Sequence, residues 1–152
     1  MTRIATICLA LFTTVLFSQN TYIQCGKLID TKKGKVYSNK TIIVSKDRIV
    51  DIKNGYITST DSGDSTIDLT NATVMPGLID LHVHIESEYN PQKYLDEFTA
   101  NEADMAFNSL EYARITLMSG FTTVRDLGGS GVNISLRNAI EKGKVIGPRI
   151  FT

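Results

Sequence analysis

Two different rhythms of apolar and polar residues follow each other along the chain. From Tyr22 to Thr73, short β-branched and apolar runs alternate with turn-like segments such as TKKGK, and no helical periodicity is visible. Runs bounded by Gly, Ser and Asp in this way predict short strands. The segment KTIIVSKDRIVDI predicts a hairpin that turns at SKD, and the polar NGYITSTDSGDS predicts a loop. We therefore expect residues 20–75 to form a small antiparallel sheet packed as a β-sandwich.

After Pro76 the rhythm changes to strand-like runs separated by helical segments. GLIDLHVHI, FTTVRDL and PRIFT are the strand-like runs, and the first is apolar enough to predict a strand buried on both faces. NEADMAFNSLEYARITLMSG has apolar residues at helical spacing and a stop at Gly120. NISLRNAIEKG predicts a second helix, with Asn133 as its N-cap and Gly143 at its end. This alternation predicts a parallel sheet with crossover helices, so we expect residues 76–152 to be α/β.

The N-terminus differs from both of these regions. MTRIATICLALFTTVLFSQN contains one charge, at Arg3, then an uncharged run over residues 4–17 and a polar end. That order of segments is typical of a secretory signal peptide, whereas a membrane-spanning helix needs about 20 apolar residues. We expect residues 1–19 to be a signal peptide cleaved after Ser18 or Gln19, and the protein to be exported to the periplasm or secreted. The alternative is an uncleaved N-terminal anchor or a buried helix.

Charge and cysteine content exclude several kinds of partner. Sixteen basic residues balance sixteen acidic ones, and no stretch concentrates one sign. We therefore expect no nucleic-acid partner and no stable membrane insertion, and a small molecule is the expected partner. Removal of the signal peptide takes Cys8 away and leaves Cys25 alone, so the exported chain forms no intrachain disulfide. The sequence does not decide the oligomeric state.

Both histidines of the chain, His82 and His84, lie in the apolar run MPGLIDLHVHI. Side chains at positions i and i+2 of a strand point to the same face, so the two imidazoles project together, with Asp80 on that face as well. Two neutral imidazoles on one face supply half of a transition-metal site. H-x-H alone is a short pattern that also arises by chance, but polar rings are costly in an apolar strand and metal coordination would satisfy them.

The stretch NATVMPGLIDLHVHI resembles the segment that opens the barrel of the metal-dependent amidohydrolase superfamily, in which P-G-L-I-D-x-H-x-H is widely shared. YIQCGKLID, TIIVSKDRIVDI and STIDLTNATVMPG are similar to the N-terminal β-sandwich of that family, in the same order. LMSGFTTVRDLGG and LRNAIEKGKVIGPRIF resemble its second barrel strand and helix, in the branch of imidazolonepropionase and Xaa-Pro dipeptidase-like enzymes. One departure is the hairpin SKDRI, which lacks the family's usual glycine.

The resemblance implies an N-terminal β-sandwich followed by the first βα units of an incomplete TIM (β/α)8 barrel. It implies that His82 and His84 bind a divalent metal, usually zinc, with one or two ions in the complete enzyme. It also implies hydrolysis of a carbon–nitrogen bond in an amide, cyclic amide or dipeptide-like substrate. In family members the remaining site residues are a carboxylated lysine, two further histidines and a catalytic aspartate, which lie on later strands. This chain has no third histidine. The catalytic residues therefore stay unknown.

Three interpretations remain open at this point. In the first, the chain is an N-terminal part of an exported amidohydrolase, and by itself it is inactive and only marginally stable. In the second, it is a non-catalytic secreted binding module with an incomplete metal site. In the third, it is half of a split enzyme. We expect Asp80 to orient the strand end rather than bind metal. RDLGG either lines the mouth of a pocket or is a strand end followed by a glycine turn.

Overall fold

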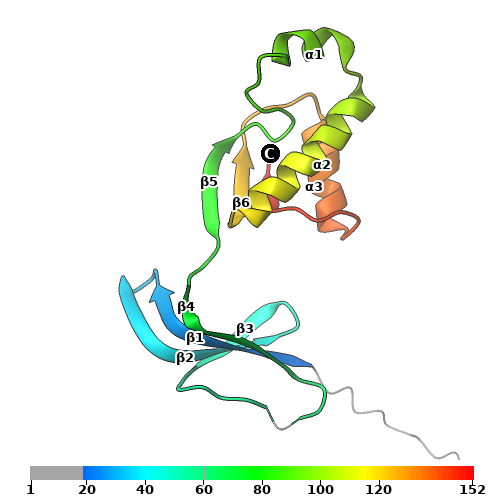
Figure 1. Cartoon of the computed structure of the whole chain (residues 1–152). Helices are drawn as coiled ribbons and strands as arrows, with labels where there is room; N and C mark the ends of the chain where they lie inside the picture. Colours follow the sequence, from blue (N-terminus) through cyan, green and yellow to red (C-terminus); the bar gives the residue numbers. More distant parts are fainter. Residues whose placement is uncertain (1–18, 60) are drawn as a thin grey trace, which may run out of the picture. The chain divides into compact units, whose positions relative to one another are not determined.

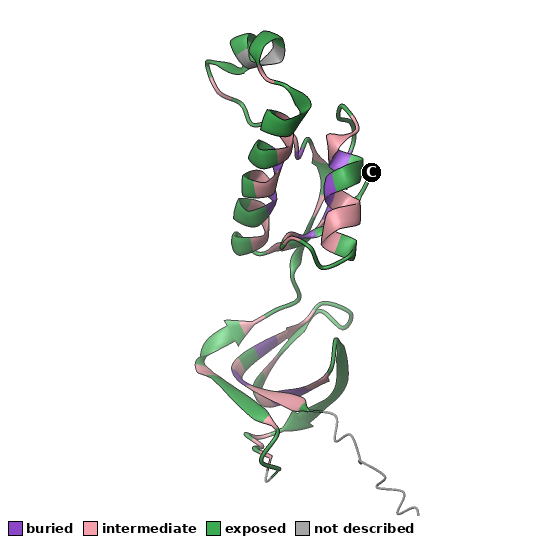
Figure 2. Ribbon diagram, turned by 90° about the vertical axis from the view of Figure 1, so that its right-hand side faces the viewer, coloured by how far each residue is buried: buried purple, intermediate pink, exposed green. Residues whose placement is uncertain are grey.

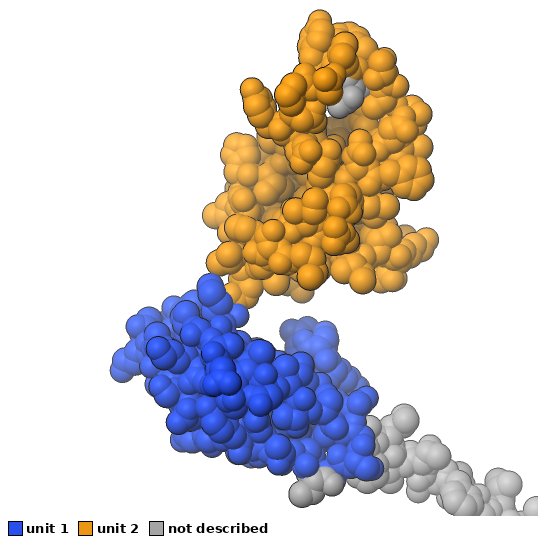
Figure 3. All heavy atoms as spheres, viewed as in Figure 1, with its two compact units in different colours: residues 1–75 blue, residues 76–152 orange. Residues whose placement is uncertain are grey.

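The computed structural model of this chain describes residues 19–59 and 61–152 (Figure 1). Contacts between residues divide the chain into two compact units, Met1–Met75 and Pro76–Thr152 (Figure 3). The segment expected to be a signal peptide lies outside the described residues except for its last position. Within the described ranges, no helix is both long enough and apolar enough to cross a membrane.

The first unit is one sheet of four strands in the order β3-β2-β1-β4. The strands are β1 (Asn20–Asp30), β2 (Lys35–Ser45), β3 (Arg48–Asn54) and β4 (Ser65–Val74). Neighbours β1, β2 and β3 pair antiparallel, and β2 and β3 form the predicted hairpin. However, β4 pairs parallel to β1, so the prediction of an antiparallel sheet is wrong at this edge. The loop between β3 and β4 is long enough to return the chain to the far edge of the sheet. A second sandwich layer stays a prediction.

Local chemistry explains three features of the first unit. The β2–β3 turn places Lys46 at φ 55°, a left-handed conformation that a tight hairpin turn needs. The bulge between β1 and β4 requires Gly26, because a Cβ there would collide with the Thr70 carbonyl oxygen. The Ser59 hydroxyl and the Asn20 backbone N–H both hold the pKa of Asp64 below its usual value. These contacts stabilise the sheet, which contains neither predicted metal ligand.

The second unit alternates strands and helices, as the sequence predicts. Its elements are β5 (Leu78–Val83), α1 (Lys93–Thr99), α2 (Glu102–Met118), β6 (Phe121–Asp126), α3 (Val132–Glu141) and β7 (Arg149–Phe151). The three strands pair in parallel in the order β5-β6-β7, so the predicted parallel α/β arrangement is confirmed. All three strands therefore end at the same edge of the sheet.

The two long helices begin in different ways. At the start of α2, Asn101 and Asp104 form a capping box, in which each side chain accepts a hydrogen bond from the other residue's backbone N–H. At the start of α3, the N-cap is Gly131, with φ 108° and no side-chain cap. The prediction that Asn133 is the N-cap is therefore wrong. Asn133 lies two positions later, and its side chain is buried against the end of β6.

A small core lies between the helices and the sheet (Figure 2). Its buried members are Ile85, Ala113, Val124, Leu136 and Ile150. The prediction that β5 is buried on both faces is wrong for the described residues, since Ile79 and Leu81 are 62% and 65% exposed. The reason is that β5 is an edge strand paired only with β6, whereas α2 packs on β6 and α3 packs on β7. Burial of the strand thus gives no support to metal binding at its histidines.

Candidate metal centre at the carboxyl end of β5

The two predicted metal ligands lie close together at the carboxyl end of β5. His82 is in the strand and His84 follows it directly. Their ring centroids are 5.5 Å apart, with the ring planes inclined at 65°, and both side chains are exposed. Asp80 does not join them as a third donor. Its Oδ1 instead accepts a hydrogen bond from the backbone N–H of His82 at 2.9 Å, which orients the strand end.

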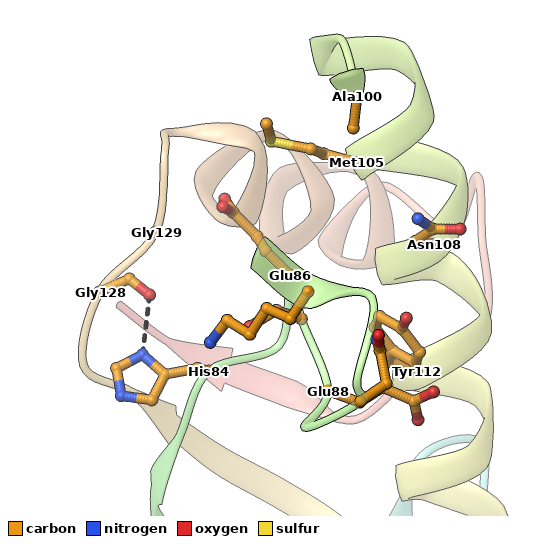
Figure 4. Close-up of a pocket in the computed structure, with 12 residues that line it drawn as sticks. His84, Glu86, Glu88, Ala100, Met105, Asn108, Tyr112, Gly128 and Gly129 are labelled. Atoms are coloured by element: carbon orange, nitrogen blue, oxygen red, sulfur yellow. Dashed lines mark hydrogen bonds between the residues drawn. The ribbon is translucent and has the colours of Figure 1, made fainter. Parts of the chain in front are cut away.

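The ring of His84 has a fixed hydrogen-bond partner. Its Nδ1 lies 3.2 Å from the backbone carbonyl oxygen of Gly128, in the loop after β6 (Figure 4). A carbonyl oxygen can only accept, so this contact requires the proton of the neutral ring to be on Nδ1. The lone pair of Nε2 is then available to a metal. Histidine ligands in metalloproteins are oriented by a second contact of this type.

The geometry fits two positions of a zinc site. Two imidazoles on one tetrahedral zinc have ring centres roughly 5 Å apart, because each nitrogen lies about 2.0–2.1 Å from the metal. The observed 5.5 Å between the rings of His82 and His84 is close to that separation. Among residues 19–59 and 61–152, no group of three or more His, Cys, Asp or Glu side chains gathers around one point. A catalytic zinc commonly has three protein ligands, so the pair supplies part of such a set.

The residues after β6 play a structural part. Asp126 is 3% exposed, and its Oδ2 accepts a hydrogen bond from Asn133 Nδ2 at 3.0 Å. The same Asn133 amide group also donates to Thr152 Oγ1 at 2.9 Å, which links α3 to the end of β7. The two open interpretations of RDLGG each hold for part of the motif. Its aspartate is a buried strand end, and its glycines line a cavity.

A cavity of about 330 Å³ opens beside His84 (Figure 4). Ligand pockets in proteins have volumes of about 300–1,000 Å³, so this one can hold a small molecule. Its walls come from the segment after β5, from the start of α1 and the residue that follows α1, from α2 and from the loop after β6. The lining residues are His84, Glu86, Ser87, Glu88, Asn90, Lys93, Ala100, Met105, Asn108, Tyr112, Gly128 and Gly129. The lining therefore combines charged groups, amides and apolar side chains.

Glu86 is the residue of this region that sequence analysis did not single out. It follows His84 by two positions, in a segment that is polar and irregular in sequence. Its carboxylate accepts hydrogen bonds from two backbone N–H groups at the start of α3, those of Ser130 and Asn133. No signal in the sequence pointed to this role, because Asn133 has the residue type of an N-cap and was itself predicted to serve the helix start.

Comparison with known sequences points to one family. The sequence profile described as the amidohydrolase family matches residues 73–152, just over half of the chain. Over 67 residues the chain is 33% identical to a 5-methylthioadenosine/S-adenosylhomocysteine deaminase of Bacillus cereus. That match covers 44% of this chain and 15% of the deaminase.

Solved structures of similar proteins cover more of the chain. A Xaa-Pro dipeptidase with methionine bound in its active site is 46% identical, with a TM-score of 0.79 over 88% of this chain and 32% of that one. A prolidase complexed with N-methylphosphonate-L-proline is 33% identical, with a TM-score of 0.72 over 88% of this chain and 31% of that one. The chain thus spans about a third of the length of these two structures.

Proposed function

Because this chain belongs to the amidohydrolase family, we propose that the protein hydrolyses a carbon–nitrogen bond in an amide, cyclic amide or dipeptide-like substrate. The observation that carries the proposal is the pair of imidazoles of His82 and His84 at the carboxyl end of a parallel strand. This is the edge at which α/β barrels and open α/β sheets place their active sites. The similarity to a Xaa-Pro dipeptidase and a prolidase supports a dipeptide-like substrate.

In the proposed reaction, His82 and His84 hold a divalent cation, and zinc suits their nitrogen donors. When bound, the metal supplies polarisation of the scissile carbonyl and activation of a water molecule. His84 contributes Nε2, because the Gly128 carbonyl holds the proton on Nδ1. Asp80 fixes the backbone at His82 and so limits where that ring can lie. The number of ions, one or two, depends on ligands beyond this pair.

The cavity beside His84 is the proposed place for the part of the substrate next to the scissile bond. Asn90 and Asn108 offer amide groups, and Lys93 offers a positive charge that suits a substrate carboxylate. Met105 and Ala100 offer apolar surface. A wall of this mixed character suits an amino-acid residue, which has a charged end group and a side chain of its own.

We also propose that residues 1–152 alone do not catalyse this reaction. The chain has two histidines, and a catalytic zinc commonly takes three protein ligands. The competing proposal is a non-catalytic binding module. It is favoured by the finding that no three-ligand group occurs in the described part of the chain. Here the full-length protein means the complete polypeptide that contains residues 1–152. The two proposals differ in what this protein does to a substrate when it is loaded with metal.

The test uses the full-length protein, loaded with zinc, and the variants His82→Ala and His84→Ala. We expect bound zinc, measured by mass spectrometry of metals, to fall well below wild-type stoichiometry in both variants. We expect release of free amino acid from a panel of Xaa-Pro dipeptides and N-acyl amino acids to be lost with it. Tyr89→Ala, a fully exposed aromatic in the same segment, is the control and should change neither quantity.

Two results would count against the proposal. Wild-type zinc content in the double variant H82A/H84A would show that the metal binds elsewhere. A zinc-loaded full-length protein that releases nothing from amides, cyclic amides and dipeptides would leave the binding module as the better account.

Export is a separate proposal, which rests on the uncharged run over residues 4–17 behind Arg3. Residues 1–25 fused to a reporter enzyme should direct it out of the cytoplasm, with a new N-terminus at Gln19 or Asn20. Leu11→Arg, which interrupts the apolar run, should block this. A reporter that keeps its original N-terminus inside the cell would contradict the proposal.

A further inference from the structure

We propose that Glu86 is a positioning residue for the metal centre. Its carboxylate anchors the loop after β6 and thereby holds the Gly128 carbonyl oxygen against Nδ1 of His84. The inference rests on the proposed function, since it takes His84 to be a metal ligand.

Glu86 binds the start of α3 with both carboxylate oxygens. Oε2 accepts from the backbone N–H of Ser130 at 2.7 Å, and Oε1 accepts from that of Asn133 at 2.5 Å. The first N–H groups of a helix have no partner within the helix, and its N-terminus attracts negative charge. The N-cap of α3 is Gly131, which offers no side chain. A carboxylate from another part of the chain therefore serves as the cap.

The loop backbone also lies directly against this carboxylate. A Cβ atom on Gly129 would be 2.5 Å from Glu86 Oε1, which is closer than a van der Waals contact permits. The backbone can therefore approach the carboxylate this closely only because residue 129 is a glycine. Gly128, which precedes it, carries the carbonyl that faces His84. The Gly128 N–H adds a weaker contact to Asp126 Oδ1 at 3.4 Å, so the end of β6 restrains the loop from the other side.

These contacts link two short segments of the chain at both of their ends. Residues 84–86 form one segment, and residues 128–130 form the other. At one end the imidazole donates to the Gly128 carbonyl, and at the other end the Glu86 carboxylate accepts from Ser130. Each of these segments is only three residues long, so a shift at the carboxylate is passed to the carbonyl. Glu86 thus acts on the His84 ring through the loop.

The chemical consequence concerns the tautomer of His84. With the loop anchored, the neutral ring keeps its proton on Nδ1 and presents Nε2 as a lone pair. Without Glu86, the N–H groups of Ser130 and Asn133 turn to water, and the Gly128 carbonyl is no longer held in place. The ring is then free to adopt the Nε2–H form, in which Nε2 cannot bind a metal. A role limited to helix stability would not change this tautomer.

The experiment compares Glu86→Ala and Glu86→Gln with the wild type in the full-length protein, first stripped of metal. Selective ¹⁵N labelling of histidine reports which ring nitrogen of His84 carries the proton, with the assignment taken from a His84→Gln spectrum. Zinc affinity is measured by competition with a chelator. Glu88→Gln is the matched control, because this exposed carboxylate lines the same cavity and makes no backbone contact among those described.

We expect E86A to reduce the Nδ1–H population of His84 and to weaken zinc binding roughly tenfold, the lower end of the effect of residues that orient metal ligands. E86Q should lie between E86A and the wild type, because its amide keeps one acceptor oxygen but turns an NH₂ group toward the other N–H. E88Q should match the wild type in both measurements. If E86A does not fold, E86Q carries the test.

Two outcomes would overturn the inference. The first is a folded Glu86 variant with a wild-type His84 tautomer, whatever happens to its zinc affinity. The second is equal loss of affinity in E86Q and E88Q. Failure of the proposed function gives a different result, since the wild type itself would then bind no zinc through His82 and His84. In that case the tautomer of the metal-free protein still decides whether Glu86 positions the ring.

Discussion

Strands β5 and β6 are parallel neighbours that end at the same edge of one sheet. The polar side chains at their carboxyl ends nevertheless differ in exposure and in hydrogen bonding. The end of β5 carries His82 and His84, whose side chains are exposed. The end of β6 carries Asp126, which is 3% exposed. Both ends follow a strand-like run in the sequence, and both carry groups that can bind metals or move protons. Their surroundings, and not their residue types, separate them.

The difference lies in how much of each group's hydrogen-bonding capacity the fold uses. Both oxygens of Asp126 accept from the fold itself, one from Asn133 Nδ2 and one from the Gly128 N–H. Of the four ring nitrogens of His82 and His84, only His84 Nδ1 has a partner among the described residues. A group whose partners are already in place holds elements together. A group that is oriented but left with free lone pairs is available to a ligand.

The largest effect on stability should follow from Asp126→Ala. The variant leaves one N–H donor of the buried Asn133 amide without its carboxylate partner, while the contact to Thr152 Oγ1 stays, and an unsatisfied buried donor costs about 1–3 kcal/mol. We expect the free energy of unfolding, measured with urea, to fall by about 2 kcal/mol. Asp126→Asn should cost less, because it keeps one acceptor oxygen.

Glu141→Ala is the control for Asp126→Ala, as it removes an exposed acidic side chain from the end of α3. It should change the free energy of unfolding by no more than about 0.5 kcal/mol. Equal effects of the two substitutions would mean that Asp126 is no more structural than a surface carboxylate, and the contrast between the two strand ends would disappear.

The sequence was sufficient to predict those features that depend on a local pattern. The alternation of strand-like and helical runs predicted the parallel α/β unit, and the spacing of His82 and His84 predicted that their rings would lie together. Gly120 and Gly143 were predicted to end helices, and both have positive φ just after α2 and α3. Each of these predictions needs only the preferences of neighbouring residues.

Features that depend on distant partners were predicted wrongly or missed. Asn133 has the residue type of an N-cap, but the carboxylate of Glu86, 47 positions earlier, serves the helix start and leaves the Asn133 side chain to Asp126. The apolar run of β5 indicated a buried strand, but burial depends on what packs on the strand and not on its own composition. No local pattern contains that information.

A smaller effect on stability should follow from Gly129→Ala in the loop after β6. The added methyl group would lie 2.5 Å from Glu86 Oε1 and 2.8 Å from Asn133 Cγ, so the carboxylate must move. We expect a loss of about 1 kcal/mol, at the low end for overpacking because a side-chain terminus can shift. Zinc affinity should fall together with stability, since Glu86 leaves Ser130.

The neighbouring glycine provides a matched control for this substitution. A Cβ on Gly128 would meet no atom within 4 Å, so Gly128→Ala adds the same methyl group without displacing anything. Its free energy of unfolding and its zinc affinity should stay near the wild-type values. If both alanine variants behave alike, the loop does not transmit a shift of Glu86 to His84.

The smallest effect should come from the histidines themselves when no metal is present. His82→Ala and His84→Ala remove exposed rings, so each should change the free energy of unfolding of the metal-free protein by less than about 0.5 kcal/mol. With zinc at about a hundred times its dissociation constant, the wild type should gain about 2.7 kcal/mol and the variants much less. Urea unfolding with and without zinc measures both quantities. A large loss in the metal-free variants would show instead that the end of β5 is structural, as the end of β6 is.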